Sequence, residues 1–297
     1  MTKATVKPRE WGGAWTETKT QIVHDYVCSY LRALQNQPFK KIYVDAFAGE
    51  GHRILARIPG LIFKERYEVF KGSPKLVLEA SSEARRPFDS FIFCETDPKR
   101  AEKLLALKTE FPQFSHSIEI REMEANAFLL NFCHSTDWKS TRALVFLDPF
   151  GMQVEWPTME ALAATRAADI WVLFPLGVSV MRLLKKRGEI SEGAKERLDR
   201  LFGNREWLDR FYKIHKPKFQ GLLYQENDEL VRCVGVRQVA EYFVERLRTV
   251  FPENGVVDPL FLFNSKNVPI YMLCFACGNQ KGVPIATKIA NHLIRGH

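Results

Sequence analysis

Two hydrophobic patterns alternate along the chain. Short runs of consecutive apolar residues predict strands that are buried on both faces, and apolar residues recurring every three or four positions predict amphipathic helices. The predicted strands span residues 41–47, 90–95, 117–123, 143–147, 169–174, 260–263 and 269–275. The predicted helices span residues 15–34, a segment starting at 73, and 98–109, 126–133, 157–165, 236–250 and 284–294. Such alternation predicts a mostly parallel sheet with helices on both faces.

Two helix starts have recognisable signals. Thr16 is placed to cap the first helix, and Ser73 is expected to cap the second with Pro74 at its first position. Between Gly51 and Gly72 the sequence has no clear period. We therefore expect an irregular insert ahead of the second helix.

A second interruption follows the fifth predicted strand. Residues 175–234 are helical in pattern, rich in basic side chains and without strand signals. The sequence therefore predicts a sheet domain made of residues 1–174 and 235–297, with a basic helical insertion over 175–234.

The length and composition suit one enlarged α/β domain. The chain has 297 residues, of which 46% are hydrophobic and 26% charged. No apolar run approaches the roughly 20 residues needed to cross a bilayer, and the polar segment 1–9 lacks the apolar centre of a signal peptide. We expect a soluble, cytoplasmic protein without a membrane segment.

The cysteines and histidines do not form a metal-binding pattern. Six cysteines lie mostly within apolar segments, which favours reduced, buried thiols over disulfides. Cys274 and Cys277 form a CxxC pair within a predicted strand, where positions i and i+3 face opposite sides. The histidines stand singly along the chain, so we predict no bound metal.

The net charge of +8 is unevenly distributed. Residues Arg182 to Lys218 contain 12 Lys or Arg and 6 Asp or Glu, a local excess of +6. This excess favours binding to DNA or RNA. A solvated helical face explains it equally well, because Lys195, Arg197 and Arg200 alternate with acidic residues at helical spacing.

A glycine-rich turn follows the first predicted strand, in the segment Asp45-Ala-Phe-Ala-Gly49-Glu-Gly51. Glycines at this position let a ligand approach the backbone closely. Glu95 ends the next strand, where a carboxylate can accept both hydrogen bonds of an adenosine ribose, although Asp97 could compete for this role. A nicotinamide site is disfavoured, because no helix begins at the second glycine.

The strand over 143–147 ends in Asp148-Pro149-Phe150-Gly151. This order resembles the [D/N]PP[F/Y] signature of methyltransferases that modify exocyclic amines of bases, and more closely the DPFG of enzymes that methylate the guanine N2 amine of tRNA. In such sites the acid accepts the amine's hydrogens and the aromatic ring stacks on the base. Here the second proline is absent and Phe150 lies one place early. Asp148 could also be a turn carboxylate, and Phe150 a core side chain.

The chain as a whole resembles the three-Cys-motif partner (TcmP) proteins. The resemblance implies a class I methyltransferase-like Rossmann fold, with a seven-stranded sheet and helices on both faces. It also implies S-adenosylmethionine as cofactor and a radical-SAM-like partner carrying three cysteines. The shared motifs are Trp15-Thr-Glu-Thr-Lys19, Tyr43-Val-Asp45-Ala-Phe-Ala-Gly49, Gly72-Ser-Pro74, Phe146-Leu-Asp148-Pro-Phe-Gly-Met152, Phe174-Pro-Leu-Gly177 and Ile270-Tyr-Met-Leu.

Three further residues have open roles under this resemblance. Asn126 occupies the third strand-to-helix turn, where family members often have an acidic pair, and could contact the adenine edge. Lys19 is either a solvent-facing helix lysine or a residue at the ligand mouth. Trp15 is most simply an aromatic anchor in the core.

The leading hypothesis is an S-adenosylmethionine-dependent methyltransferase acting on a nucleic-acid base amine. The catalytic candidates are Asp148, Pro149 and Phe150. The cofactor-binding candidates are Asp45, Phe47, Gly49, Gly51, Glu95 and Asn126. One alternative is an accessory subunit of the three-cysteine partner, which should have a blocked pocket beside Asp148. A second alternative is a nucleic-acid-binding module that uses only the basic insertion.

Overall fold

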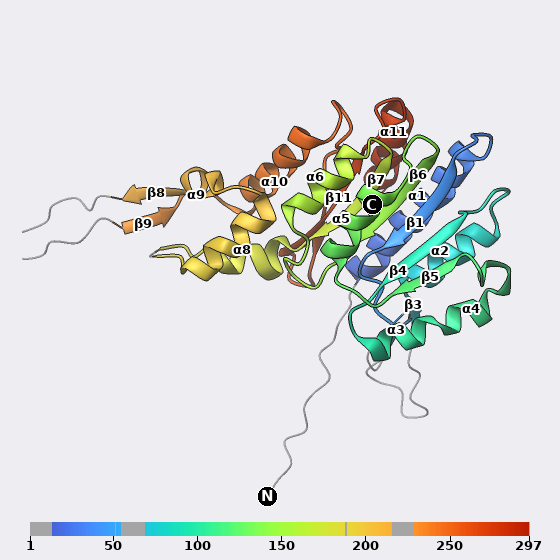
Figure 1. Cartoon of the computed structure of the whole chain (residues 1–297). Coiled ribbons are helices and arrows are strands. Elements are labelled where there is room, and N and C mark those ends of the chain that lie inside the picture. Colours follow the sequence, from blue (N-terminus) through green and yellow to red (C-terminus); the bar gives the residue numbers. More distant parts are fainter. Residues whose placement is uncertain (1–13, 51, 55–68, 188, 216–228, 297) are drawn as a thin grey trace, which may run out of the picture.

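A seven-stranded sheet forms the centre of the molecule (Figure 1). The computed structural model describes residues 14–50, 52–54, 69–187, 189–215 and 229–296. The strands are β1 (Lys40–Asp45), β4 (Ser90–Cys94), β5 (Ile118–Arg121), β6 (Thr141–Leu147), β7 (Ala168–Phe174), β10 (Leu260–Phe263) and β11 (Pro269–Cys277). Their order is β10-β11-β7-β6-β1-β4-β5, and β11 runs antiparallel to both of its neighbours. This is the class I methyltransferase-like Rossmann fold, as predicted.

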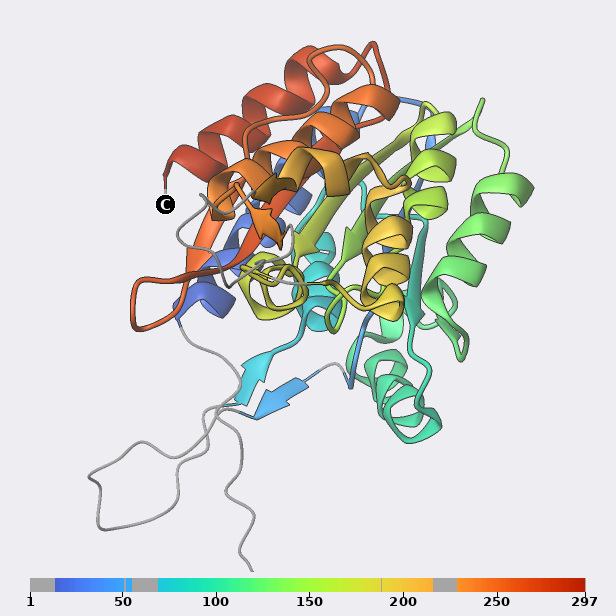
Figure 2. The same ribbon diagram turned by 90° about the vertical axis from the view of Figure 1, so that its left-hand side faces the viewer.

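Helices cover both faces of this sheet (Figure 2). They are α1 (Ala14–Leu34), α2 (Ser73–Ser82), α3 (Pro98–Leu104), α4 (Ala106–Glu110), α5 (Ala125–Ser135), α6 (Trp156–Ala164), α10 (Val236–Val250) and α11 (Val283–Arg295). The apolar sides of α1, α2 and α11 pack on one face. Those of α5, α6 and α10 pack on the other. Burial on both faces explains why the strands read as continuous apolar runs.

The strand register brings several strand ends together. Asp45, at the end of β1, is paired with Phe93 of β4 on one side and with Phe146 of β6 on the other. Because β4, β1 and β6 are parallel neighbours, the residues that follow them meet at one edge of the sheet. We call this the carboxyl edge, and the opposite edge the amino edge.

The segment after β7 is only partly helical, so its prediction as a strand-free insertion was wrong. It contains a π-helical turn (Leu176–Val180), α7 (Met181–Leu183), α8 (Glu192–Phe202) and α9 (Glu206–Phe211). It also contains β8 (Tyr212–His215), paired antiparallel with β9 (Glu229–Arg232) and projecting away from the sheet (Figure 1). Both strands are short and largely uncovered, and thus lack the apolar signal of a buried strand.

Three local predictions also need correction. The insert ahead of α2 includes an antiparallel ladder of β2 (His52–Ile54) and β3 (Val69–Lys71). Thr16 lies inside the first turn of α1, which begins at Ala14, and therefore does not cap it. Gly72 occupies the N-cap of α2, so Ser73 is already the first helical residue and its hydroxyl bonds elsewhere.

The cysteine prediction is confirmed in part. All six cysteines are free, but only Cys94, Cys274 and Cys277 are buried, whereas Cys28 and Cys133 are half-buried and Cys233 is exposed. Cys274 belongs to the core on one face of the sheet and Cys277 to the core on the other, as their spacing in an extended strand requires. Within the described ranges, no group of three or more possible metal ligands occurs, and no helix is long and apolar enough to span a membrane.

Candidate functional site at the carboxyl edge

The turn after β1 forms the centre of the carboxyl edge. Gly49 has a φ of +63°, a left-handed conformation that favours glycine, and a Cβ built on it would meet no atom within 4 Å. The backbone N–H of Ala48 donates to the carbonyl of Cys94 at 2.9 Å, which ties the turn to β4. The turn therefore presents open backbone at the place where the sequence predicts a ligand. Gly51 lies outside the described residues.

Asp45 is fully buried beneath this turn. One carboxylate oxygen accepts a hydrogen bond from the Ser73 hydroxyl at 2.5 Å, and the other accepts one from the backbone N–H of Phe47 at 3.2 Å. Burial, with a smaller contribution from the nearby charge of Asp148, raises the pKa of Asp45 to about 7 against the lowering effect of the Ser73 bond. Asp45 thus anchors the turn and the start of α2, a role that explains the Gly72-Ser73-Pro74 motif.

Glu95 follows β4 and is 9% exposed. Its Oε1 accepts from the backbone N–H of Asp97 at 2.9 Å. Its Oε2 accepts no hydrogen bond from any other described residue. Asp97 instead caps α3, with its Oδ1 accepting from the backbone N–H groups of Lys99 and Arg100. This arrangement favours Glu95 over Asp97 for a ribose.

The side-chain amide of Asn126 makes four contacts within the protein. Its Nδ2 donates to Glu124 Oε1 at 2.7 Å and to the carbonyl of Gln153 at 2.8 Å. Its Oδ1 accepts from the backbone N–H of Glu155 at 3.0 Å and from the Thr158 hydroxyl at 2.8 Å. Two donors and two acceptor positions complete the hydrogen-bonding capacity of an amide. Asn126 therefore links α5 to the start of α6, and an adenine contact would require breaking one of these bonds.

Asp148 forms an ion pair that sequence reasoning did not predict. Lys19 Nζ, from α1, lies 2.6 Å from Asp148 Oδ2, and the two side chains are only 3% and 9% exposed. The ammonium also lies 5.4 Å from the centre of the Trp15 ring, which packs against Tyr271. Lys19 is thus not a solvent-facing lysine, and Trp15 is an aromatic anchor. The pair fixes the direction of the Asp148 carboxylate.

The turn after Asp148 exposes an aromatic ring. Phe150 is 58% exposed, which excludes the core role considered for it. Gly151 has a φ of +76°, a left-handed conformation. The backbone N–H of Phe150 donates to Gln153 Oε1 at 2.7 Å, and this hydrogen bond within the turn stabilises its conformation. The guanidinium of Arg100, from α3, lies 5.9 Å from the ring centre. The exposed ring of Phe150 therefore lies at the outer rim of the carboxyl edge.

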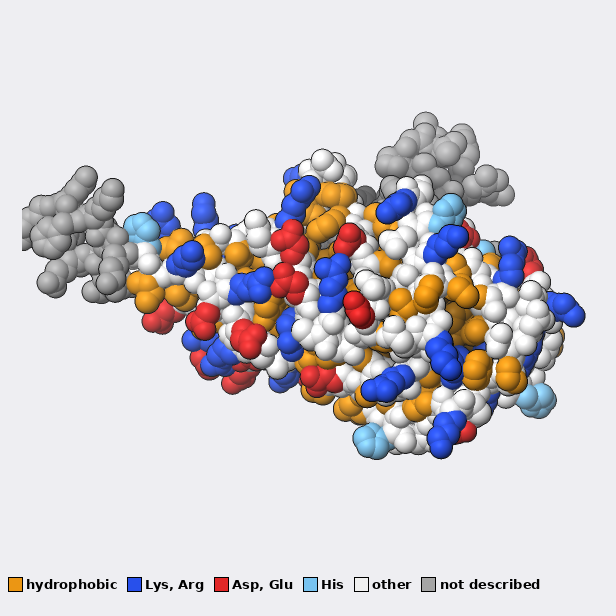
Figure 3. All heavy atoms as spheres, turned by 90° about the horizontal axis from the view of Figure 1, so that it is seen from above, with side chains coloured by type: hydrophobic (Ala, Val, Ile, Leu, Met, Phe, Trp, Pro, Cys, Tyr) orange, Lys and Arg blue, Asp and Glu red, His pale blue; other side chains and the backbone are white. Residues whose placement is uncertain are grey.

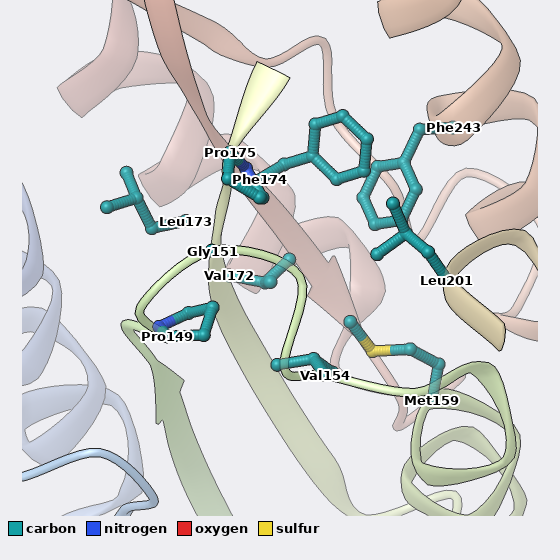
Figure 4. Close-up of a pocket in the computed structure, with 10 residues that line it drawn as sticks. All are labelled: Pro149, Gly151, Val154, Met159, Val172, Leu173, Phe174, Pro175, Leu201 and Phe243. Carbon is teal, nitrogen blue, oxygen red and sulfur yellow. The ribbon is translucent and has the colours of Figure 1, made fainter. Parts of the chain in front are cut away.

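The opposite side of this turn is closed. Pro149 is buried and lines a narrow apolar pocket with Phe174, Leu201 and Phe243 (Figure 4). The free volume of this pocket is about 10 Å³, room for about one water molecule. Leu201 belongs to α8 of the insertion. A ligand larger than about one water molecule cannot enter beneath Pro149, so the accessible side of this turn is that of Phe150.

The basic segment divides into two parts. On α8, on α9 and in the turn between them, Lys195, Arg200, Arg205 and Arg210 each form an ion pair with an acidic residue, whereas Arg197 and Lys213 are exposed and form no ion pair with another described residue. Acidic and basic side chains are correspondingly interspersed on the projecting arm in Figure 3. Four exposed residues just after the π-helical turn form no ion pair with any other described residue; they are Arg182, Lys185, Lys186 and Arg187. We call these four residues the basic cluster.

Hydrogen bonds to backbone carbonyls fix the position of the basic cluster. The Tyr212 hydroxyl donates to the carbonyl of Lys185, and the backbone N–H of Arg232 donates to the carbonyl of Lys186. β8 and β9 therefore position this segment. Lys216 and Lys218, which the sequence count includes, lie outside the described residues.

Comparisons with known proteins support the fold alone. No protein-family model matches the chain, and no curated protein matches it by sequence. Among solved structures it is similar to protein LPL1258 of Legionella pneumophila, of family DUF519, at 13% identity over 92% of this chain and 89% of that chain, with a TM-score of 0.51.

Two further solved structures are similar more loosely. One is the putative methyltransferase yhhF of Escherichia coli, at 14% identity over 77% of this chain and 87% of that chain, with a TM-score of 0.31. The other is magnesium protoporphyrin IX methyltransferase of Synechocystis with bound SAM, at 11% identity over 76% and 86%, also with a TM-score of 0.31.

Proposed function

We propose that the chain is an S-adenosylmethionine-dependent methyltransferase of the TcmP family that acts on an exocyclic amine of a nucleic-acid base. The observation that carries the proposal is the arrangement of the carboxyl edge. An open glycine turn, the Glu95 carboxylate and the buried Asp148–Lys19 pair follow three adjacent parallel strands. Open α/β sheets bind ligands at this edge.

The described residues fit the cofactor. Open space beside Gly49 leaves room for a ligand against the turn, and Glu95 Oε2 is without a described donor, so it can accept a ribose hydroxyl. The hydrogen bond from the backbone N–H of Phe47 to Asp45 stabilises this turn. When bound, S-adenosylmethionine supplies an activated methyl group on a sulfonium. The protein then needs mainly to position the acceptor.

Asp148 and Phe150 are suited to that positioning. The Asp148 carboxylate, fixed by Lys19, accepts a hydrogen from the amine and directs its lone pair inward. The exposed Phe150 ring stacks on the base, with Arg100 beside it. The basic cluster follows β7 on the same edge and supplies contacts to phosphates.

Methyl transfer from labelled S-adenosylmethionine to DNA and RNA pools tests this proposal. We expect Asp148→Ala to lower the transfer rate roughly 100-fold or more while cofactor affinity changes less than about threefold, because the acceptor loses its hydrogen-bond partner whereas Glu95 and the glycine turn are unchanged. Asp258→Ala, the same change at an exposed carboxylate elsewhere, should leave the rate unchanged. Full transfer by Asp148→Ala would contradict the assigned role.

A second candidate is an accessory subunit that keeps the fold and works with a three-cysteine partner. The favouring observation is the closed pocket beneath Pro149, to which the insertion contributes Leu201. This function predicts no methyl transfer by the chain with any nucleic acid, with or without the partner, and a stable complex of the two proteins. Measuring transfer and co-elution in the same preparations separates the two candidates.

A further inference from the structure

A second cavity lies at the amino edge, away from the candidate site. Its volume is about 360 Å³, within the range of small-molecule sites. Its lining includes Arg142 near the start of β6 and Asp169 near the start of β7. Arg142 and Asp148 are six residues apart along one strand direction, which corresponds to roughly 20 Å. The cavity is therefore separate from the carboxyl edge, and its ligand is independent of the proposed function.

The walls of the cavity are largely apolar. The aliphatic side is formed by residues of α1 and α11, namely Leu34, Ile285, Ala286 and Ile289. Phe39 adds an aromatic ring, and the Arg142 guanidinium lies over this ring at 3.7 Å from its centre. Ile285 is 59% exposed, so part of the aliphatic side is not covered by the protein. Covering such surface favours a ligand with an apolar body.

The carboxylate at the cavity already interacts with groups of the protein. Asp169 is 7% exposed and accepts a hydrogen bond from the Tyr26 hydroxyl at 3.0 Å. The Cys277 thiol is a second hydrogen-bonding neighbour of this carboxylate. Burial raises the pKa of Asp169 to about 6, and the positive charge of Arg142 acts in the opposite direction. Asp169 therefore has both donors and a nearby opposite charge without any ligand.

The two cations at the cavity are less completely engaged. Arg142 Nη1 donates to the carbonyls of Trp138 and Thr141, and Nε is buried. Nη2 forms no hydrogen bond with any described residue and, unlike Nε, has accessible surface. Lys281, in the turn before α11, is exposed and forms no ion pair with another described residue. The charged lining residues are Arg142, Lys281 and Asp169, which gives an excess of one positive charge.

We propose that the amino-edge cavity binds a small aliphatic monocarboxylate. Its apolar body lies between α1 and α11, and its carboxylate lies at Lys281 and Arg142 Nη2. A monoanion matches the excess positive charge of the lining, whereas a cation is repelled by it. A neutral molecule of the same shape gains the apolar contacts but not this attraction.

Three molecules of the same chain length test the proposal with the full-length protein at neutral pH. Heptanoate is an anion, heptan-1-ol is neutral and heptylamine is a cation. Ligand-observed NMR titration should show saturable binding of heptanoate that is at least about fivefold tighter than that of the alcohol or the amine. Saturating S-adenosylhomocysteine should not displace heptanoate. Equal or tighter binding of the alcohol or the amine, displacement, or no saturable heptanoate binding would overturn the proposal.

Two lysines provide a matched pair of variants for the carboxylate contact. Lys281→Gln should weaken heptanoate binding about twofold to fivefold and leave heptan-1-ol binding unchanged, because the ammonium attracts only the charged group. Lys288 is exposed on α11 but does not line the cavity, so Lys288→Gln should change neither affinity. Both side chains are exposed, so both variants should fold. Unchanged heptanoate affinity in Lys281→Gln, or equal losses in both variants, would contradict the assigned contact.

A second pair of variants tests the location of the probe. Ala33 lines the cavity from the exposed side of α1, and Ala33→Trp should fill the space and weaken binding of heptanoate and heptan-1-ol at least about tenfold. Ala164→Trp makes the same change at an exposed position on α6 and should leave both affinities unchanged. Full heptanoate binding by Ala33→Trp would place the probe outside this cavity and overturn the proposal.

Discussion

The two edges of the sheet stabilise buried carboxylates differently. At the carboxyl edge, Asp148 is paired with a lysine ammonium at 2.6 Å. At the amino edge, Asp169 accepts a hydrogen bond from the neutral Tyr26 hydroxyl, and burial raises the pKa of Asp169 to about 6. Asp45, beneath the glycine turn, also has only neutral donors and a raised pKa of about 7.

This difference distinguishes two kinds of site. A carboxylate with a buried counter-ion keeps its charge and direction, as acceptor positioning requires. A carboxylate held by neutral donors in a buried place can take up a proton near neutral pH. The carboxyl edge therefore combines an ion-paired carboxylate, Asp148, with a protonatable acid, Asp45, whereas Asp169 at the amino edge is of the protonatable kind.

Removing the counter-ion should have the largest effect. Lys19→Met leaves Asp148 buried without its ammonium, and we expect the free energy of unfolding to fall by about 3–5 kcal/mol in denaturant titrations. Tyr26→Phe at the amino edge should cost only about 1–3 kcal/mol, because a neutral bond is lost. Adding Asp148→Asn to Lys19→Met should recover most of the loss. A loss below about 1 kcal/mol in Lys19→Met would contradict a buried pair.

The pH dependence of stability should show the two protonatable acids. Both folded-state pKa values are raised, so the folded protein binds more protons than the unfolded chain above pH 4, and stability falls as pH rises. We expect the decrease to extend to about pH 6 for Asp169 and about pH 7 for Asp45, at about 1.4 kcal/mol per unit of pKa difference. Asp45→Asn should flatten the part between pH 6 and 7. An unchanged profile in this variant would contradict its raised pKa.

Truncating Asn126 should have an intermediate effect at the carboxyl edge. Asn126→Ala leaves the Thr158 hydroxyl and the Glu155 N–H without their acceptor, and should lower the free energy of unfolding by about 2 kcal/mol. The exposed Asn36→Ala provides the control, with a change below about 0.5 kcal/mol. If Asn126→Ala keeps full stability but loses cofactor affinity, then Asn126 contacts the adenine as the sequence suggested.

The basic cluster should have the smallest effect in free energy. Neutralising Lys185, Lys186 and Arg187 to Gln should weaken nucleic-acid binding about tenfold at low salt and reduce the salt dependence of the affinity. Neutralising Lys195, Arg200 and Arg205, which are ion-paired, should change affinity much less. Equal losses in both triple variants would indicate a diffuse charge effect rather than the cluster.

The sheet was predictable because its strands are buried on both faces. Residues 143–147 and 170–174, for example, are apolar throughout and lie in β6 and β7. The β8–β9 ladder was missed because all of its residues except Tyr212 are half-buried or exposed and carry no alternating pattern. A strand is recognised in the sequence by the apolar residues that it buries, and β8 and β9 bury few residues.

Only those parts of the site that depend on a single strand and the turn after it could be predicted from the sequence. The positions of Glu95 and Asp148 follow from the ends of two strands. The Lys19–Asp148 pair joins residues that are 129 positions apart, and the Ser73–Asp45 bond joins residues 28 apart. Such pairs depend on how α1 and α2 pack against the sheet. The motif Trp15-Thr-Glu-Thr-Lys19 was the one signal that could have pointed to Lys19.

Binding of S-adenosylmethionine measured by calorimetry tests the central claim most directly. The wild-type protein should bind in the micromolar range, and Glu95→Ala should lose binding, because the ribose loses its carboxylate. Glu102→Ala, an exposed carboxylate on α3, should bind like the wild type. No binding by the folded wild-type protein, or equal binding by Glu95→Ala, would contradict a cofactor site at the carboxyl edge.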